Sequence, residues 1–542
     1  LIRMIEQDEF AVQRQAAMAL GRIGSSKAVP TLLNALAETD DPMLSHALVF
    51  ALIEINDHDA TLPGLQHPSP RVLRGALVAL DQMTNGELTR ELVGPLVNTD
   101  DAPLTHAVLD IVLRNSDWAD MAADLLTQWL VEPELSQPRQ KLLKKSLLTL
   151  HSQPSIQNVI SQSLASSKFS LSSRLMLLDV IAECAVRELP KAWDQQLHVG
   201  LRSRQEIVVQ HALDAMAAKD AGQFDKELSS FAKDSSQLVA LRVKAASILT
   251  QGRATLTDEN FALLQGQCSD DAGFETRLEA ARALGNAKLS SAQLGEVLEL
   301  LPQAGPLELP VLLNAFADSW QRDSASRLGL RLVASLSTAR SFPSVTEAQL
   351  NKLFKEAPTD VRKAAERLTR RLVEEQAQSL RTVLKTTFSL VGGDPARGKK
   401  IFFSKMALCS ACHQVNDQGN PIGPDLRSIG KVRNHRDLLE AILLPSSSFA
   451  RGFESKTVTT QSGRIHAGII RSETDDTITL YTSQRQEFKI KRAEIDEILP
   501  SKVSIMPAGL ERSLTSDDLR DLLAYLTTLK GPAPTRDTIT SP

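Results

Sequence analysis

Two cysteines three positions apart, followed at once by a histidine, occur in the segment Cys409-Ser410-Ala411-Cys412-His413. This pattern is typical of the attachment site of a c-type heme. The two intervening residues let both sulfurs reach the vinyl groups along one edge of the porphyrin, while the imidazole ligates the iron from below. The sequence therefore predicts one covalent heme c, with thioethers to Cys409 and Cys412 and with His413 as the proximal iron ligand.

Two other interpretations of this cysteine pair require a different sequence context. A thioredoxin-like dithiol is expected within a βαβ unit, and half of a zinc site is expected near a second pair of cysteines or histidines. The sequence around Cys409 supplies neither context. The remaining cysteines, Cys184 and Cys268, are remote and lie in apolar helical stretches, where we expect them to be small core residues.

Residues on either side of the motif predict how it is held. Asp394 followed by Pro395 is typical of a helix start, with the aspartate as the N-cap. Phe402 lies on the apolar face of that helix, and we assign it to the heme-binding residues. Pro424 follows His413 and has no N–H, but its carbonyl can accept a hydrogen bond from the imidazole nitrogen that does not face the iron. Such a bond would fix the tautomer, so Pro424 is also predicted to belong to the site.

Met506 is the predicted distal ligand of the iron. It lies in a loop bounded by Pro507 and Gly509, shortly before Thr515, which is expected to cap the last helix of the domain. A thioether in a rigid loop at this place suits ligation of the far heme face.

Two histidines are weaker candidates for the distal ligand, and a second methionine is excluded. Met406 is too close to the cysteines to reach across the heme. His435 and His466 remain alternatives, although a surface or strand position is the simpler interpretation of each.

Taken in order, these motifs resemble a class I cytochrome c domain. More narrowly, they resemble the heme-binding domain of planctomycete and verrucomicrobial type, whose members carry an insertion between the Gly-Pro loop and the ligand methionine. The resemblance rests on Gly393-Asp394-Pro395, the heme motif, Gly423-Pro424-Asp425-Leu426, Met506-Pro507 and Leu522-Leu523-Ala524-Tyr525-Leu526.

The corresponding insertion, at about residues 453–499, changes from helical periodicity to strand periodicity. Short β-branched runs with period two alternate with turn signals. The runs cover residues 456–460, 465–470, 477–482, 488–490 and 495–498. We predict a small antiparallel β-barrel or curled sheet and assign it no function.

Residues 1–385 show helical periodicity and a recurring alanine-rich helix, which resembles HEAT repeats. In such repeats small alanines let paired helices approach closely, and each pair buries its apolar stripe against its neighbours. Copies occur at residues 12–21, 71–80, 244–249, 280–285 and 361–365. We predict an α-solenoid whose repeat count stays open, because residues 133–205 show helices without a crisp repeat signature.

These patterns together predict a multidomain, mainly α protein, in which a HEAT-like α-solenoid precedes an all-α class I cytochrome c domain with a small antiparallel β insertion. The predicted boundaries are 1–385 for the solenoid, 386–452 and 501–530 for the two parts of the cytochrome c domain, 453–500 for the insertion, and 531–542 for a disordered tail.

Composition and chemistry limit the partners and the compartment. A net charge of −4 and a pI near 6.3 argue against a nucleic-acid binder, and no apolar run reaches transmembrane length. Heme thioethers are normally made on the oxidising side of a bacterial membrane, so we expect a periplasmic or otherwise exported protein. No signal peptide opens the sequence, which begins at Leu1, and we expect a fragment or processed product of a longer protein.

The predicted activity is outer-sphere electron transfer. Ligation by His413 and Met506 would keep the iron low-spin in both oxidation states, so little geometry changes on reduction. In the family that the chain resembles, the HEAT and heme regions commonly follow a β-propeller similar to a sugar or sorbosone dehydrogenase. This resemblance implies a redox partner or dehydrogenase domain as electron donor, and we expect the chain to be a carrier rather than an enzyme by itself.

Two further functions stay open. A heme enzyme or a gas or redox sensor would have a labile sixth ligand in place of a firmly bound Met506. Alternatively, the solenoid could act as a protein-interaction scaffold with an accessory heme.

Overall fold

The computed structural model describes most of the chain, which forms two compact units, Leu1–Phe224 and Asp225–Pro542. The predicted disordered tail lies outside the described residues, apart from residues 531 and 532. The described residues are 1–97, 99, 101–132, 135–186, 188–219, 221–250, 256–269, 271–321, 325–386, 392–404, 406–461, 465–474, 476–482, 487–501 and 503–532.

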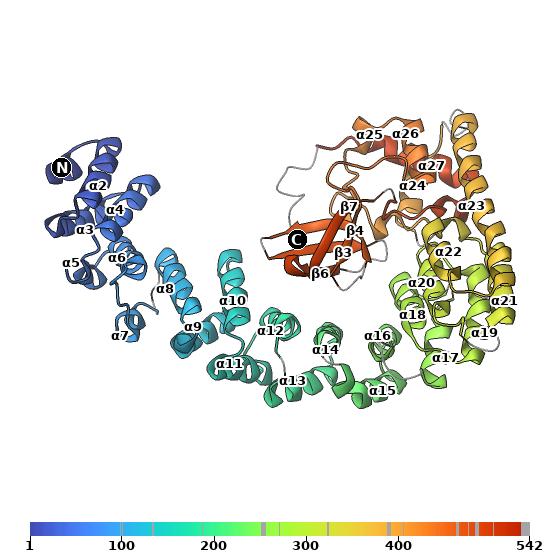
Figure 1. The fold of residues 1–542 in the computed structure, drawn as a ribbon, viewed down its shortest axis with the longest axis horizontal. Coiled ribbons are helices and arrows are strands. Elements are labelled where there is room, and N and C mark those ends of the chain that lie inside the picture. The colour runs from blue at the N-terminus through green and yellow to red at the C-terminus, as the bar shows by residue number, and fades with distance from the viewer. Residues whose placement is uncertain are drawn as a thin grey trace. The chain divides into compact units, whose positions relative to one another are not determined.

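Helices joined by short turns build the first unit. Alternate helices pack on one another, α2 on α4, α4 on α6 and α12 on α14, while α9, α11 and α13 form a second row (Figure 1). The α-helices are α1 (Ile2–Gln7), α2 (Phe10–Ile23), α3 (Val29–Glu38), α4 (Pro42–Ile55), α5 (His58–Thr61), α6 (Pro70–Gln82), α7 (Arg90–Val93), α8 (Ala102–Arg114), α9 (Ala119–Val131), α10 (Gln137–Thr149), α11 (Pro154–Ala165), α12 (Leu171–Glu183), α13 (Lys191–Leu201) and α14 (Glu206–Ala218).

The second unit begins with helices of the same kind. Here α16 packs on α18, and α21 packs on α23. The predicted HEAT-like α-solenoid is therefore confirmed as the architecture of the helical part. These α-helices are α15 (Asp225–Lys233), α16 (Val239–Leu249), α17 (Asp258–Gly266), α18 (Phe274–Asn286), α19 (Ser291–Leu300), α20 (Glu308–Leu312), α21 (Ala325–Thr338), α22 (Glu347–Phe354) and α23 (Thr359–Thr386).

Polar contacts between solenoid helices join residues about one repeat apart. Lys145 Nζ donates to Asp110 Oδ1 at 2.9 Å across a sequence separation of 35 residues. In the second unit, the indole N–H of Trp320 donates to the carbonyl of Leu353 at 2.7 Å across a separation of 33 residues. In both places a bond joins elements one repeat apart within the same unit, as expected where a repeat contacts its neighbours.

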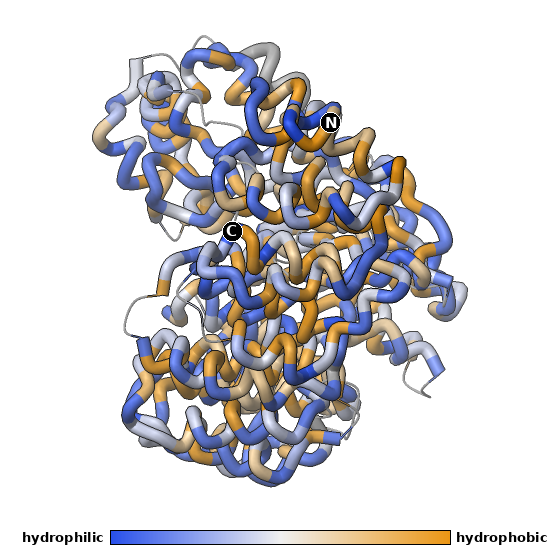
Figure 2. Tube along the Cα trace, turned by 90° about the vertical axis from the view of Figure 1, so that its left-hand side faces the viewer, coloured by the Kyte–Doolittle hydropathy of each residue, from blue (hydrophilic) through white to orange (hydrophobic). Residues whose placement is uncertain are grey.

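Small residues let the solenoid helices approach closely, as the alanine-rich pattern predicted. Ala17 is fully buried, and a Cβ added to Gly21 would lie 3.0 Å from the Cα of Ala51 on the next-but-one helix. Figure 2 shows hydrophobic and hydrophilic residues alternating along the helical turns, as in helices that bury one face. Within the described residues, no helix combines the length and the apolar character that a membrane span requires.

The region without a crisp repeat signature also consists of packed helices. In it α10 packs on α12, and α11 packs on α13. The indole N–H of Trp193 donates to the carbonyl of Gln157 at 3.0 Å across 36 residues. The alternation of the flanking helices therefore continues through residues 133–205, although larger apolar residues replace the alanines that mark the other repeats.

The helices of the C-terminal region gather around one hydrophobic core. Phe402 is fully buried there, with its ring centroid 5.8 Å from that of Tyr525. Asp394 and Thr515 are N-caps of the first and last helices, so both predicted helix starts are confirmed. The helices are α24 (Pro395–Phe402), α25 (Ile429–Val432), α26 (His435–Leu443) and α27 (Ser516–Thr528).

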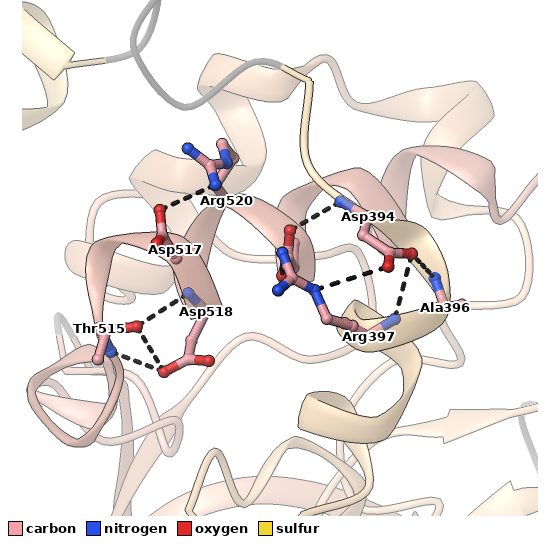
Figure 3. Close-up of polar contacts among 8 residues, drawn as sticks. Asp394, Ala396, Arg397, Thr515, Asp517, Asp518 and Arg520 are labelled. Carbon is pink, nitrogen blue, oxygen red and sulfur yellow. Dashed lines mark hydrogen bonds and ion pairs between the residues drawn. The ribbon is translucent and has the colours of Figure 1, made fainter.

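The backbones of α24 and α27 come into contact at a glycine. A Cβ added to Gly398 would lie 2.0 Å from the carbonyl oxygen of Asp521. The carboxylate of Asp521 is 2% exposed; it accepts a hydrogen bond from the N–H of Asp394 at 2.7 Å and pairs with Arg397 Nη2 at 2.8 Å. Figure 3 shows Asp394 and Arg397 facing α27. This packing joins the two ends of the C-terminal region.

Residues 456–500 form a five-stranded antiparallel sheet with strand order β6-β5-β4-β3-β7. Val458, Leu480 and Ile490 form its buried core. Each predicted strand is present, the last strand β7 pairs with the first strand β3, and no pairing joins the edge strands β6 and β7 among the described residues. The strands are β3 (Lys456–Thr460), β4 (Ile465–Glu473), β5 (Thr477–Thr482), β6 (Glu487–Lys491) and β7 (Ile495–Pro500).

Candidate heme site

The predicted heme motif begins on a short 3-10 helix, η9 (Cys409–Ala411). Leu408, directly before it, has a left-handed backbone with φ of +56° and turns the chain into the helix. The N–H groups of Cys412 and His413 both donate to the carbonyl of Cys409, at 3.2 and 2.9 Å. The two thiols and the imidazole therefore project from one tight helical turn, as covalent attachment to a single porphyrin edge requires.

The imidazole of His413 is fixed between two consecutive residues. Its Nδ1 lies 2.8 Å from the carbonyl oxygen of Pro424, which is the hydrogen bond that the sequence predicted. Because a carbonyl can only accept, Nδ1 carries the proton and Nε2 keeps a lone pair for a metal. Gly423 packs against the ring, since a Cβ there would lie 2.7 Å from Cε1. Desolvation lowers the pKa of His413, against an opposing effect of the Pro424 hydrogen bond, so the neutral imidazole is favoured.

The chain between His413 and Pro424 folds back as a small hairpin. Strand β1 (Gln414–Val415) pairs with β2 (Gln418–Gly419), and the two residues between them have positive φ angles, as a type I′ turn requires. The N–H groups of Ile422 and Gly423 then donate to the carbonyl of Cys412, at 3.0 and 2.6 Å. These bonds return the chain to the face of the imidazole.

Cys409 and Cys412 are not joined by a disulfide. Cys409 packs against the hydrophobic core of the region, and burial raises the pKa of its thiol to about 12. A redox-active dithiol instead depends on a thiolate with a lowered pKa. Within the described part of the chain, no group of three or more His, Cys, Asp or Glu side chains is placed to hold a metal ion. The dithiol interpretation is therefore disfavoured.

The other two cysteines lie in the solenoid. Cys184 is 5% exposed, as expected for a core residue. Cys268 follows the end of α17 and is partly exposed as a residue, but its thiol lies 3.5 Å from the carbonyl oxygen of Leu264. Burial raises the pKa of this thiol to about 12, so the prediction is confirmed for the thiol and not for the whole residue.

Met506 lies in the loop between β7 and the 3-10 helix η11 (Leu510–Ser513), and it is half-buried. Its N–H donates to Ser504 Oγ at 3.1 Å, and the N–H of Ser504 donates to Ser446 Oγ at 3.1 Å. The loop is thus tied to the chain that follows α26. These bonds give the loop a defined path, and ligation of iron by Met506 stays a prediction.

The excluded Met406 and the two alternative distal ligands, His435 and His466, occupy different surroundings. Met406 is 50% exposed. His435 is the first residue of α26, and its Nε2 is enclosed by protein without a hydrogen-bond partner. His466 lies on β4 with its ring centroid 4.7 Å from that of Phe488, which agrees with the simpler interpretation of a strand residue.

One contact at the site was not anticipated from the sequence. The Gly-Pro dipeptide was interpreted through the proline carbonyl alone, but Gly423 is the residue whose missing side chain makes room for the imidazole. Phe402, in turn, is placed in the helix core beside Tyr525 and Phe403. The glycine next to the proline was the available signal, because close approach of a side chain to a backbone is a common reason for glycine.

The donor set fits a c-type heme. Two thiols on one helical turn, an imidazole with Nε2 available for ligation and a nearby hydrophobic core are the parts that such a group needs. Cys409 and Cys412 would hold the porphyrin covalently, and His413 would supply the first axial ligand.

Two protein families match parts of the chain. The HEAT repeats family matches residues 1–66, and the cytochrome c family matches residues 395–498. The second match includes the heme motif and ends before Met506. A search of curated proteins found no match.

Two solved structures resemble the chain at low sequence identity. A crystal structure of importin beta has 13% identity and a TM-score of 0.37 over 72% of this chain and 55% of that chain. A crystal structure of a Kap121p mutant has 12% identity and a TM-score of 0.42, and the match covers 83% of this chain and 55% of that chain. The chain therefore spans about half the length of these structures. The matches identify HEAT repeats at the N-terminus and a cytochrome c domain near the C-terminus, and the latter supports heme-based electron transfer on a HEAT scaffold.

Proposed function

We propose that this chain is a c-type cytochrome electron carrier built on a HEAT-repeat scaffold. One heme c would be bound through Cys409 and Cys412, with His413 as proximal and Met506 as distal ligand of the iron. Bound heme supplies reversible one-electron chemistry. The residues of the chain bind the group, hold the proximal imidazole neutral and oriented, and surround it with apolar side chains.

The observation that carries this proposal is the hydrogen bond between His413 Nδ1 and the carbonyl of Pro424, at 2.8 Å. Outer-sphere partners of this kind fix the tautomer and orientation of a metal-bound imidazole and raise its basicity as a ligand. Gly423 restricts the same ring from a second direction. A histidine held in this way suits a permanent axial ligand, because neither rotation nor protonation is needed during electron transfer.

The proposed electron donor is an exported dehydrogenase domain or protein. The motifs resemble the planctomycete and verrucomicrobial type, in which such a domain commonly precedes the HEAT and heme regions. The β3–β7 sheet supports this assignment, since it lies in the chain between Pro424 and Met506, where that type carries its insertion. We propose a periplasmic or otherwise exported location for the same reason, and further protein partners for the solenoid surface.

Production of the full chain in a host that matures c-type hemes tests the proposal. We expect heme that stays attached to the protein after denaturation, and loss of this heme in a double Cys409→Ser, Cys412→Ser variant. The oxidised protein should show the far-red charge-transfer band of methionine-ligated heme.

A pair of methionine variants tests the distal ligand. Met506→Ala should abolish the charge-transfer band and lower the reduction potential, while Met406→Ala, at an exposed methionine near the motif, should change neither. A protein without covalent heme would refute the carrier. A high-spin spectrum with ready carbon monoxide binding would instead favour the heme enzyme or sensor with a labile sixth ligand.

A further inference from the structure

The chain segment that follows Met506 is bound to the last part of the solenoid by an ion pair. Arg512 Nη2 lies 2.6 Å from Glu375 Oε2, across a sequence separation of 137 residues. Glu375 belongs to the long helix α23, and its other carboxylate oxygen lies 2.6 Å from Arg371 Nε one turn earlier. The carboxylate is therefore held by its own helix while it binds the arginine.

A second close approach to the solenoid lies nearer to Met506. Gly509, three residues after the methionine, has a left-handed φ of +85°, and a Cβ added to it would lie 3.5 Å from Cβ of Pro343. Pro343 belongs to the 3-10 helix η8 (Phe342–Ser344). The neighbouring Phe342 is fully buried, and its ring lies 5.2 Å from the guanidinium carbon of Arg371. The solenoid residues that meet the loop are thus packed on one another.

A third contact joins the same segment to the heme motif. Ser513 Oγ donates to the carbonyl of Met406 at 2.8 Å, across 107 residues. The short segment from Gly509 to Ser513 therefore touches the solenoid on one side and the chain leading to Cys409 on the other. The position of this segment therefore depends on both the solenoid and the chain before the heme motif.

We infer that the C-terminal part of the solenoid is a positioning element for the distal iron ligand, with Glu375 acting through Arg512. This inference rests on the proposed role of Met506. Neutralising Glu375 would remove a charge-assisted bond six residues from the methionine, so the loop would hold Met506 less firmly in the position from which it would ligate the iron. The HEAT region would then influence ligation of the heme iron by Met506 as well as support the heme domain.

The size of the effect follows from the exposure of the pair. The side chains of Arg512 and Glu375 are 36% and 21% exposed, so solvent screens much of their attraction. Partly exposed pairs of this kind change an equilibrium by about two- to fivefold. They also weaken as added salt screens the charges.

Binding of imidazole to the oxidised holoprotein provides the test, because imidazole competes with methionine for the iron. We expect Glu375→Gln and Arg512→Gln each to raise the apparent affinity for imidazole about two- to fivefold. In the double variant Glu375→Gln with Arg512→Gln, the affinity should rise no further than in either single variant, because both changes remove the same interaction. Glu299→Gln, which removes an exposed ion pair with Arg331 in the solenoid, is the matched control and should leave it unchanged.

A salt titration of the wild type and of Glu375→Gln gives a second measurement. Added salt should raise the imidazole affinity of the wild type more than that of Glu375→Gln. Equal affinities in the wild type and both single variants, or an equal change in Glu299→Gln, would overturn the inference. Failure of the proposed function would look different, since the wild type itself would lack the charge-transfer band and Met506→Ala would bind imidazole as the wild type does.

Discussion

The solenoid and the cytochrome c region differ in how far apart in sequence their contacting residues lie. The bond from Trp320 to Leu353 in the solenoid spans 33 residues, whereas the bond from Asp394 to Asp521 in the heme region spans 127. Contacts between neighbours make the stability of a repeat array a sum of local terms. Contacts that join distant ends make the heme region fold as one unit. The entropy lost in closing such long loops is offset only when the contacts of the whole core form.

The largest expected effect is at the glycine where α24 crosses α27. In Gly398→Ala the new Cβ would lie 2.0 Å from the carbonyl oxygen of Asp521, and a backbone cannot move aside as a side chain can. We expect a loss of about 3 kcal/mol or more in the stability of the heme region. Denaturation followed by heme absorbance measures this loss, while far-UV circular dichroism follows the solenoid.

Gly75→Ala in the solenoid is the matched control. Its Cβ would lie 2.5 Å from Cδ1 of Leu36, and this flexible side chain can rotate away. Alanine also favours the helix by about 1 kcal/mol relative to glycine, so the net change should stay within about 1 kcal/mol. Equal losses at the two glycines would show that both regions respond to crowding in the same way.

The next effect concerns the buried carboxylate that joins the ends of the heme region. Asp521→Asn keeps the size of the side chain but removes the charge that pairs with Arg397. We expect a loss of about 2 kcal/mol, measured by denaturant unfolding. Asp517→Asn is the control on the same helix, since Asp517 is 70% exposed in its pair with Arg520 and should change stability by about 0.5 kcal/mol or less. A comparable loss in both variants would contradict a special role for burial.

Features that depend on adjacent residues could be predicted from the sequence. The helix start at Asp394-Pro395, the strand segments and the N-cap at Thr515 are local signals, and the structure contains all of them. The hydrogen bond between His413 and Pro424 was also predicted. The heme motif identifies His413 as the iron ligand, and the second ring nitrogen of such a ligand usually donates to a nearby acceptor.

Features that depend on distant residues could not be predicted in this way. Nothing in the sequence near Glu375 indicates that Arg512 will bind it, since the two are 137 residues apart. The burial of Asp521 likewise arises only from packing, and the glycine at position 423 signals a close approach without identifying the imidazole as the group that approaches. The helices of residues 133–205 alternate in the same way as their neighbours. Larger apolar residues replace the alanines there, so the repeat could not be recognised from an alanine-rich pattern.

The smallest expected effect compares one capping box in each region. Thr515 Oγ1 accepts from the N–H of Asp518 at 3.1 Å, and the aspartate accepts from the N–H of Thr515 in return. Thr346 and Gln349 make the same pair of bonds in the solenoid. Thr515→Ala and Thr346→Ala should each lower the free energy of unfolding by about 1 kcal/mol at neutral pH. Only Thr515→Ala should lower the denaturation midpoint that is followed by heme absorbance.

The stability losses of the two cap variants should differ further at low pH. The hydrogen bonds from Thr515 hold the pKa of Asp518 below its usual value of 3.8. A carboxylate with a lowered folded-state pKa contributes stability above the unfolded pKa, and this contribution is lost as the pH falls through the folded-state value. The cost of Thr515→Ala should therefore shrink below pH 3.8, whereas the cost of Thr346→Ala should not, because the amide of Gln349 does not titrate. Denaturant unfolding of both variants and the wild type across this range measures the difference, and a parallel decline in both costs would mean that the charge of Asp518 contributes nothing to its cap.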